Sequence, residues 1–512
     1  MAQAVPHKLK LEENPLPLPG RFKRTKFPAT EGTTHNGRQS HILLPNGRNM
    51  YLNCKNSWLN FTVQPTVTGT NLPTAEIPAN PDTGTITYTN EDSLAVDPMG
   101  LVACIQRITV TNNKLPIFVL NDYNKVHSML CVAQGSASSQ GVRALTGGAT
   151  FAGGFIPDNL APPLANNLEP TRLIKGFGNG EILTSTGTKF VGPKMGASIP
   201  LLGLLGNAQI PLAELKGEVE IIIDWVEDGR NLILTAPKQT TDAIAVTGMD
   251  TTVTAVDFAV TEVSYDGAVT VLDDASQLAV QAENATRTEP IMWSDKYYYA
   301  FGKNIGPVDL GNATTVRRND IISSTRVTSL CAMYFAGFCT PKVNPSGETT
   351  VANKNWESFN VPHIFYDKVR YRIGGIEHPK QMIDSVPQMV QNTVACSSNN
   401  DPSIVTGLMK HPLTTNDWKP EQTAWSTGTN PAPDALSKAY RFVNRGVCAC
   451  NFEAFPDTYS ISGLDASSVD TECEYEITGN DTATYAQSIR AIWLAVYDVV
   501  YVIEDGQIRK AK

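Results

Sequence analysis

The sequence is short of charge, of long apolar runs and of helix signals. Only 18% of its 512 residues are charged, and 41 Lys and Arg against 50 Asp and Glu give a formal net charge of −9. With 41% hydrophobic residues, it is too apolar for an intrinsically disordered chain. Its acidic balance argues against a protein that binds nucleic acid over its whole surface. The 38 Gly follow no three-residue period, which excludes a collagen-like chain.

Signals for membrane insertion or export are also missing. No window reaches the roughly 18 uncharged apolar residues of a membrane helix, and the first twenty residues lack the apolar core of a signal peptide. The nine cysteines are scattered and odd in number, unlike a disulfide framework. We therefore expect reduced, buried thiols in a protein that is not secreted by a signal peptide.

The dominant pattern is a series of short β-prone runs separated by Gly, Pro, Asn and Asp. Thr, Val, Ile and Tyr fill these runs, and several alternate with period two. Val256–Leu272 is interpreted as a strand pair or a bent strand, and Ile321–Phe338 as one long strand broken near Ala336-Gly337. The other expected strands lie in Met50–Val63, Thr85–Thr89, Ile105–Thr111, Glu218–Val226, Lys296–Phe301, Lys368–Gly375, Tyr440–Val443, Glu472–Ile477 and Ser488–Ile503.

Few helices are expected. Asp122 is a candidate cap for a short helix through Leu130, and Asp273-Asp274 for another through Val280. A third, over Gln381–Val394, is interrupted by Pro387. The pattern predicts an all-β fold of two tandem β-sandwiches that join between Leu272 and Pro290.

The two ends of the chain are basic. The first 40 residues hold seven Lys and Arg and three Glu, a net of +4 that leaves −13 for the remainder. The expected organisation is a Pro-rich basic arm over 1–44, sandwiches over 45–280 and 281–504, and a basic tail over 505–512. These ends are either solubilising tails or surfaces that dock on something acidic, such as a genome or an anionic lipid. The candidate contact residues are Arg21, Lys23, Arg24, Lys26, Arg509, Lys510 and Lys512.

Enzyme motifs are missing. There is no phosphate-binding loop, no nucleophile elbow and no close histidine pair, and the Gly176–Gly180 cluster is interpreted as a plain loop. His127 and Cys131 share a helix face but are expected to be packed rather than catalytic. Cys448, Cys450 and Cys473 are interpreted as buried thiols rather than zinc ligands, and Asp465, Asp470 and Glu472 as a solvated turn rather than a calcium site. We predict no catalytic, cofactor or metal site, and a structural or binding protein rather than an enzyme.

An ordered set of weak motifs runs along nearly the whole chain. It begins with Asn46–Leu52 and Asp122–Val126, continues with Ile210-Pro211-Leu212 before Glu218–Val226, and ends at Trp493–Gly506. Its most specific member is Val369–Pro379, an aromatic-Arg-Ile-x-Gly segment that ends at proline. Their order resembles the double jelly-roll major capsid proteins of tailless icosahedral DNA viruses, of the polinton-like virus, adintovirus and virophage type.

This resemblance implies a fold and a function. Two jelly rolls would stand side by side, and three chains would form a pseudo-hexameric capsomer, a homotrimer that tiles the facets of an icosahedral virion. The partners would be neighbouring capsomers, penton and minor or cement proteins, with genome DNA or an inner membrane at the basic ends. The alternatives are a non-capsid or minor-shell double jelly-roll protein (a scaffold) and a glycan-processing enzyme on the same fold.

Overall fold

The computed structural model describes most of the β-framework of the chain. The described residues are 20–47, 49–70, 72, 74–76, 87–89, 94–97, 99–134, 146–147, 184–185, 188–235, 252–286, 290–305, 315–323, 327–339, 360, 362, 364–396, 446–453, 463–478 and 489–511. The expected strand at Tyr440–Val443, the glycine cluster at Gly176–Gly180 and Lys512 lie outside them.

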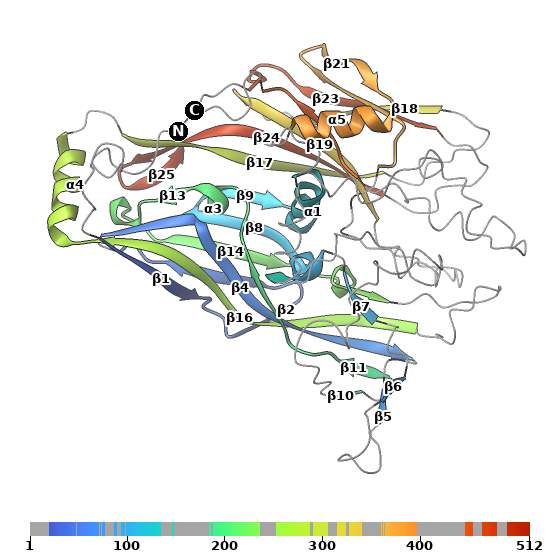
Figure 1. Cartoon of the computed structure of the whole chain (residues 1–512), viewed down its shortest axis with the longest axis horizontal. Coiled ribbons are helices and arrows are strands. Elements are labelled where there is room, and N and C mark those ends of the chain that lie inside the picture. Colours follow the sequence, from blue (N-terminus) through green and yellow to red (C-terminus); the bar gives the residue numbers. More distant parts are fainter. Residues whose placement is uncertain are drawn as a thin grey trace, which may run out of the picture.

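The first half of the chain forms a sandwich of two antiparallel sheets (Figure 1). Sheet 1 has eight strands: β1 (Gly20–Pro28), β2 (Thr33–His35), β4 (Met50–Thr70), β10 (Thr184–Ser185), β11 (Lys189–Val191), β12 (Met195–Ile199), β13 (Gln209–Ile210) and β16 (Thr252–Leu272). Sheet 2 has the order β3 (Gln39–Leu44), β14 (Val219–Trp225), β8 (Ile105–Asn112) and β9 (Leu115–Asn121).

Short elements complete this sandwich. β5 (Thr74–Glu76) pairs with β6 (Thr87–Thr89), and β7 (Leu94–Val96) pairs with β15 (Ile233–Thr235). The helices are α1 (Tyr123–Gln134), α3 (Leu204–Asn207) and the 3-10 turns η3 (Gly100–Cys104), η7 (Leu212–Glu214) and η8 (Gly229–Asn231).

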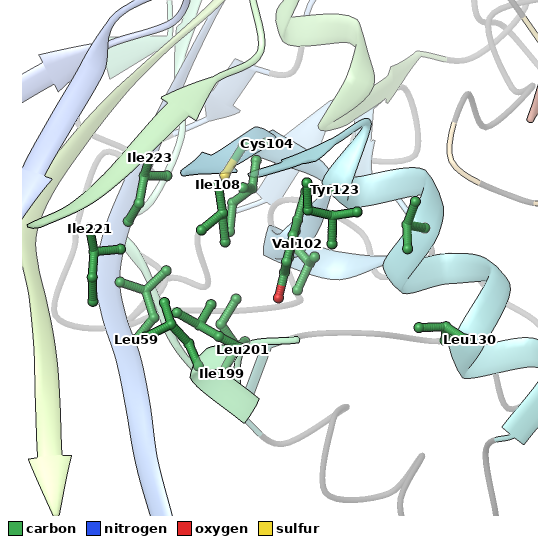
Figure 2. Close-up of a cluster of buried hydrophobic side chains, with 14 of the residues drawn as sticks. Leu59, Val102, Cys104, Ile108, Tyr123, Leu130, Ile199, Leu201, Ile221 and Ile223 are labelled. Carbon is green, nitrogen blue, oxygen red and sulfur yellow. The ribbon is translucent and has the colours of Figure 1, made fainter. Parts of the chain in front are cut away.

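Alternating side chains build the core between sheets 1 and 2. β14 buries every second residue, from Val219 to Trp225, because neighbouring side chains of a strand point to opposite faces. β4 alternates in the same way from Leu59 to Val67. Figure 2 shows how Leu59, Ile108, Tyr123, Ile199 and Ile221 meet from β4, β8, α1, β12 and β14.

The second half forms another sandwich. Sheet 3 contains β17 (Ile291–Ile305), β24 (Ile489–Glu504), β19 (Leu330–Cys339), β22 (Cys448–Asn451) and β25 (Gln507–Lys510). Sheet 4 has the order β18 (Thr315–Ser323), β23 (Thr471–Thr478), β20 (Lys368–Ile373) and β21 (Ile376–Ile383), and α5 (Val386–Ala395) follows β21. Helix α4 (Asp274–Thr286) joins the two sandwiches.

Sheet 3 is buried on both faces. Phe335 and Trp493 face sheet 4, in a core that belongs to the second sandwich. Tyr334, Ile492 and Leu494 alternate with them and lie in a core that is continuous with that of the first sandwich. This double burial explains why β19 and β24 are apolar almost without interruption.

Two predicted details need correction, and one pair of alternatives is decided. Ile321–Phe338 is not one strand, because β18 ends at Ser323 in sheet 4 and β19 starts at Leu330 in sheet 3, where it continues through Ala336-Gly337. Pro387 does not interrupt α5 but lies in its first turn, where a missing amide hydrogen is tolerated. Val256–Leu272 is a single strand with register shifts, one of them between Asp266 and Ala268.

The predicted basic ends are not separate from the sandwiches where the structure describes them. β1 pairs with β16 from Gly20 to Pro28, and β3 pairs with β14 from Gln39 to Leu44. β25 pairs with β24. The proline and basic residues predicted an arm, but Phe27 is buried and the backbone of β1 completes an edge of sheet 1.

Candidate functional site

The four basic candidates of the N-terminal region lie on the edge strand β1. Arg21, Lys23, Arg24 and Lys26 are all exposed. The Arg24 guanidinium lies 3.2 Å from the carboxylate of Asp266 on β16. The strand therefore presents a basic edge that is anchored to the sandwich through its backbone.

The C-terminal candidates make contacts within the chain. Arg509 pairs with Glu504 at 3.5 Å. The Lys510 ammonium lies 3.8 Å from the centre of the Tyr297 ring, and burial lowers the pKa of this lysine to about 8. Lys510 thus helps to fasten β25 to sheet 3.

Both basic segments lie at the same end of the molecule. Gly20 of β1 is opposite Leu272, the last residue of β16, and α4 begins two residues later. β17 starts after α4, and its first residue Ile291 pairs with Ile503, next to the turn into β25. Figure 1 shows the start of β1, α4 and β25 at the left. We call this the α4 end.

The His127–Cys131 pair is packed inside the first sandwich. Cys131 Sγ lies 3.2 Å from His127 Nδ1, and both residues are buried. The cavity beside His127 has a volume of only about 10 Å³ and is bounded by Met99, Val102 and Ile199 among others. It is too small for a substrate.

The other thiol candidates are also core residues. Cys448, Cys450 and Cys473 are buried, and burial raises the pKa of the Cys450 thiol to about 12. A zinc ligand must be a thiolate, which this environment disfavours. The acidic candidates are engaged locally: Asp465 accepts a hydrogen bond from the Ser467 amide at 2.9 Å, and Glu472 from Asn319 at 2.9 Å.

A polar cluster in the second sandwich carries no sequence signature. The Lys296 ammonium lies 2.8 Å from Glu453, 2.9 Å from Asp498 and 3.0 Å from Cys331 Sγ. Within the described residues, Cys331, Glu453 and Asp498 are the one group that could hold a metal ion. The Lys296 ammonium already balances the negative charges of Glu453 and Asp498. Burial acts to lower the pKa of Lys296, but the hydrogen bonds with Glu453, Cys331 and Asp498 raise it.

The contact between the two sandwiches is a feature that the sequence does not indicate. Phe118 of β9 packs edge-on against Tyr297 of β17, with ring centres 5.3 Å apart. Asp122, at the start of α1, does not cap its helix with its carboxylate as predicted. That carboxylate accepts from Gln106 at 3.1 Å and pairs with Arg490 of β24 at 2.6 Å. We call this contact the seam.

None of the helices in the described part of the chain has the length and apolar character that a membrane crossing requires. The described chain consists of two β-sandwiches joined by a seam, with a cavity of only about 10 Å³ beside His127 and a basic α4 end. The class that this geometry defines is the double jelly roll.

Comparison with known proteins supports that class. No family model and no curated protein matches the sequence. Among solved structures, a chain of the Sputnik virophage is similar over 97% of this chain and 89% of its own, with a TM-score of 0.57 and 9% identity. The Faustovirus major capsid protein is similar over 96% and 91%, with a TM-score of 0.52 and 10% identity.

A chain of the PBCV-1 virus capsid is similar over 96% of this chain and 97% of its own, with a TM-score of 0.50 and 11% identity. These likenesses span both sandwiches. The predicted double jelly-roll fold, and the resemblance to capsid proteins at the level of the fold, are confirmed.

Proposed function

We propose that this chain is the major capsid protein of an icosahedral virus. The observation that carries the proposal is the extent of the likeness: the structure of the Faustovirus major capsid protein is similar over 96% of this chain, and thus over both sandwiches. The seam joins the two sandwiches through a shared core, and this suits a shell subunit, which must keep its shape while it contacts many neighbours.

Three copies form the capsomer in this proposal. A closed trimer contains six jelly rolls and has a pseudo-hexagonal outline that can tile a flat facet. The division of the chain at residues 280 and 281 falls within α4, so each copy contributes a sandwich on either side of this helix. Neighbouring capsomers, pentons and cement proteins complete the virion.

The protein has no catalytic role in this proposal. The solved structures it resembles include capsid components, and the candidate pairs that an enzyme would use are packed or neutralised. His127 and Cys131 border a cavity of only about 10 Å³. Lys296 neutralises Glu453 and Asp498.

The α4 end faces the interior of the shell in this proposal. Exposed Arg21, Lys23, Arg24 and Lys26 present positive charge there, and Arg509 and Lys510 belong to the same end. Lys512 lies outside the described residues and is assigned to this group by its sequence position alone. Genome DNA, an inner membrane or a cement protein would supply the negative partner.

The test is native mass measurement and negative-stain imaging of the purified full-length protein. We expect a mass three times that of the 55.5 kDa chain and particles with a hexagonal outline. Quantitative mass spectrometry of purified virions should find this chain as the most abundant protein. A stable monomer, or a low copy number in the virion, would contradict the proposal in favour of a minor-shell or scaffold protein.

A further inference from the structure

The two sandwiches are built on one plan. Sheet 2 has the order β3-β14-β8-β9 and sheet 4 the order β18-β23-β20-β21. In both, the last two strands form a hairpin that leads into a helix, which is α1 after β9 and α5 after β21. A surface on one sandwich therefore has an equivalent on the other.

Within the chain, sheet 3 covers the helix side of the first sandwich. Tyr297 contacts Phe118 on β9, and Arg490 pairs with Asp122 at the start of α1. Gln134 at the end of α1 donates to the Tyr334 hydroxyl at 2.9 Å. α1 is buried from Tyr123 to Ala133, between elements of its own sandwich and sheet 3.

The equivalent helix of the second sandwich has no such cover in the described structure. Pro387, Gln388 and Gln391 form an exposed side of α5. Asp384 follows β21 directly, as Asp122 follows β9, and it is exposed. Among the described residues no salt bridge is recorded for Asp384, whereas Asp122 is paired with Arg490.

The outer face of sheet 1 is the equivalent of the covering face of sheet 3. On β4 it carries a row of uncharged polar residues, which are Asn60, Thr62, Gln64, Thr66 and Thr68. A recess of about 410 Å³ opens on this face between Lys26, Ser198 and Glu262, and Gly196 lines it. Exposed Lys189 on β11, opposite Thr68, adds a cation that suits Asp384.

We propose that the outer face of sheet 1 of one copy packs on the β21–α5 surface of the next copy. The contact repeats between chains what the seam does within one chain. It is head-to-tail, so a turn that closes after three copies gives a ring of six sandwiches. The inference rests on the proposed trimer and names the two surfaces that form it.

The seam within one chain and the proposed contact between copies differ in polarity, because the first forms during folding and the second during assembly. The seam combines an apolar core with the Asp122–Arg490 pair and forms as the chain folds. Along β4 the outer face of sheet 1 is polar and uncharged, with Lys26, Lys189 and Glu262 beside this row, so it can face water before it docks. The Lys189–Asp384 pair would set direction and register.

Photo-crosslinking tests the contact on an otherwise native chain. A benzophenone amino acid replaces Gly196, where an added Cβ meets no atom within 4 Å. We expect the trimer to be retained and the cross-linked peptide, identified by mass spectrometry, to come from residues 376–396 of another copy. A trimer whose cross-links lead to sheet 1 of another copy, or that forms none, overturns the inference but not the trimer. Loss of the trimer in the unmodified chain would overturn the proposed function instead.

A charge reversal provides a second test of the proposed contact. Asp384→Lys should weaken the trimer by roughly tenfold or more, since it places a cation against Lys189. Glu504→Lys is the matched control, because Glu504 is half exposed and lies at the β24–β25 turn. Circular dichroism checks the fold of each variant. If a folded Asp384→Lys protein keeps a trimer as tight as that of the control, the inference is wrong.

Discussion

Arg370 and Glu474 are the centre of a charged ladder on the outer face of sheet 4. Arg370 Nε lies 2.7 Å from Glu474, and the side chains are only 13% and 4% exposed. Arg317 and Arg372 also contact Glu474, at 2.6 and 2.9 Å. Burial alone would raise the pKa of Glu474, but the hydrogen bond and charge of Arg370 lower it.

Arg370→Ala should lower the free energy of unfolding by about 3 kcal/mol, because it leaves a buried carboxylate with weaker compensation. Urea denaturation of the purified protein measures this. Lys368→Ala is the control, since Lys368 is 45% exposed and its pair with Glu476 should contribute at most about 1 kcal/mol. Equal losses of unfolding free energy in the two variants would show that the burial of the Arg370–Glu474 pair does not increase its contribution to stability.

Asp295 is a second acidic residue whose negative charge is disfavoured by burial. Its Oδ1 accepts the Lys296 amide at 2.8 Å, while its Oδ2 is buried with no hydrogen-bond partner among the described residues. Burial raises the pKa of this carboxyl to about 7, although Lys296 acts against the shift. Below about pH 7 the protonated form therefore predominates in the folded state.

Because the folded pKa is above the unfolded one, Asp295 contributes stability at low pH that is lost as the pH rises from about 4 through 7. Asp295→Asn should therefore raise the free energy of unfolding by roughly 4 kcal/mol at pH 8, since the pKa shift is about three units and each unit corresponds to about 1.4 kcal/mol. The gain should shrink steadily toward pH 5 in parallel urea titrations. A gain that is independent of pH would contradict the assigned pKa.

At the scale of elements, β1 combines two roles. Its backbone pairs with β16 over nine residues, and its basic side chains project from the edge of the sheet. Removing it would uncover the edge of β16, and open strand edges promote aggregation. Truncation can therefore separate the role of the strand from that of the residues before it.

Deleting residues 1–28 should lower the melting temperature by several degrees more than deleting residues 1–19 and should cause aggregation, because only the longer deletion removes β1. Differential scanning calorimetry and light scattering measure the two effects. If both truncations behave alike, β1 does not stabilise sheet 1.

At the scale of the whole molecule, the two sandwiches are joined at the seam by a shared hydrophobic core. Leu494 and Ile492 of sheet 3 share a core cluster with Phe118 and Ile221 of the first sandwich. A shared core of this kind couples the unfolding of both parts.

Leu494→Ala should lower the free energy of unfolding by about 2–4 kcal/mol, since Leu494 is fully buried. Hydrogen exchange followed by mass spectrometry should show matched losses of protection in β14 and β23, one strand from each sandwich. A loss confined to β23 would mean that the sandwiches unfold independently.

The β-framework was largely predictable because its cause is local. Alternation in Ile105–Thr111 and Glu218–Val226 reports one buried face, and β8 and β14 lie at those places. Helices α1 and α4 were predicted in the same way. Errors came where a run depends on distant partners: Ile321–Phe338 is divided between sheets 4 and 3, which no local pattern indicates.

The candidate surfaces were predictable only in part. The basic residues near both ends were visible as composition, and their gathering at one end follows from the pairing of β1 with β16 and β25 with β24. The seam contacts Phe118–Tyr297 and Asp122–Arg490 join residues 179 and 368 positions apart in the sequence. Nothing in the neighbourhood of either residue indicates its partner.

By itself, the sequence determined that this protein is an all-β chain with two sandwich-sized halves and basic ends, since periodicity and charge are local properties. Only the tertiary structure decided that the halves share a core and that β1 and β25 are parts of sheets. The reason is physical: a strand's alternation reveals that one face is buried, but only the packed sheets reveal what buries it.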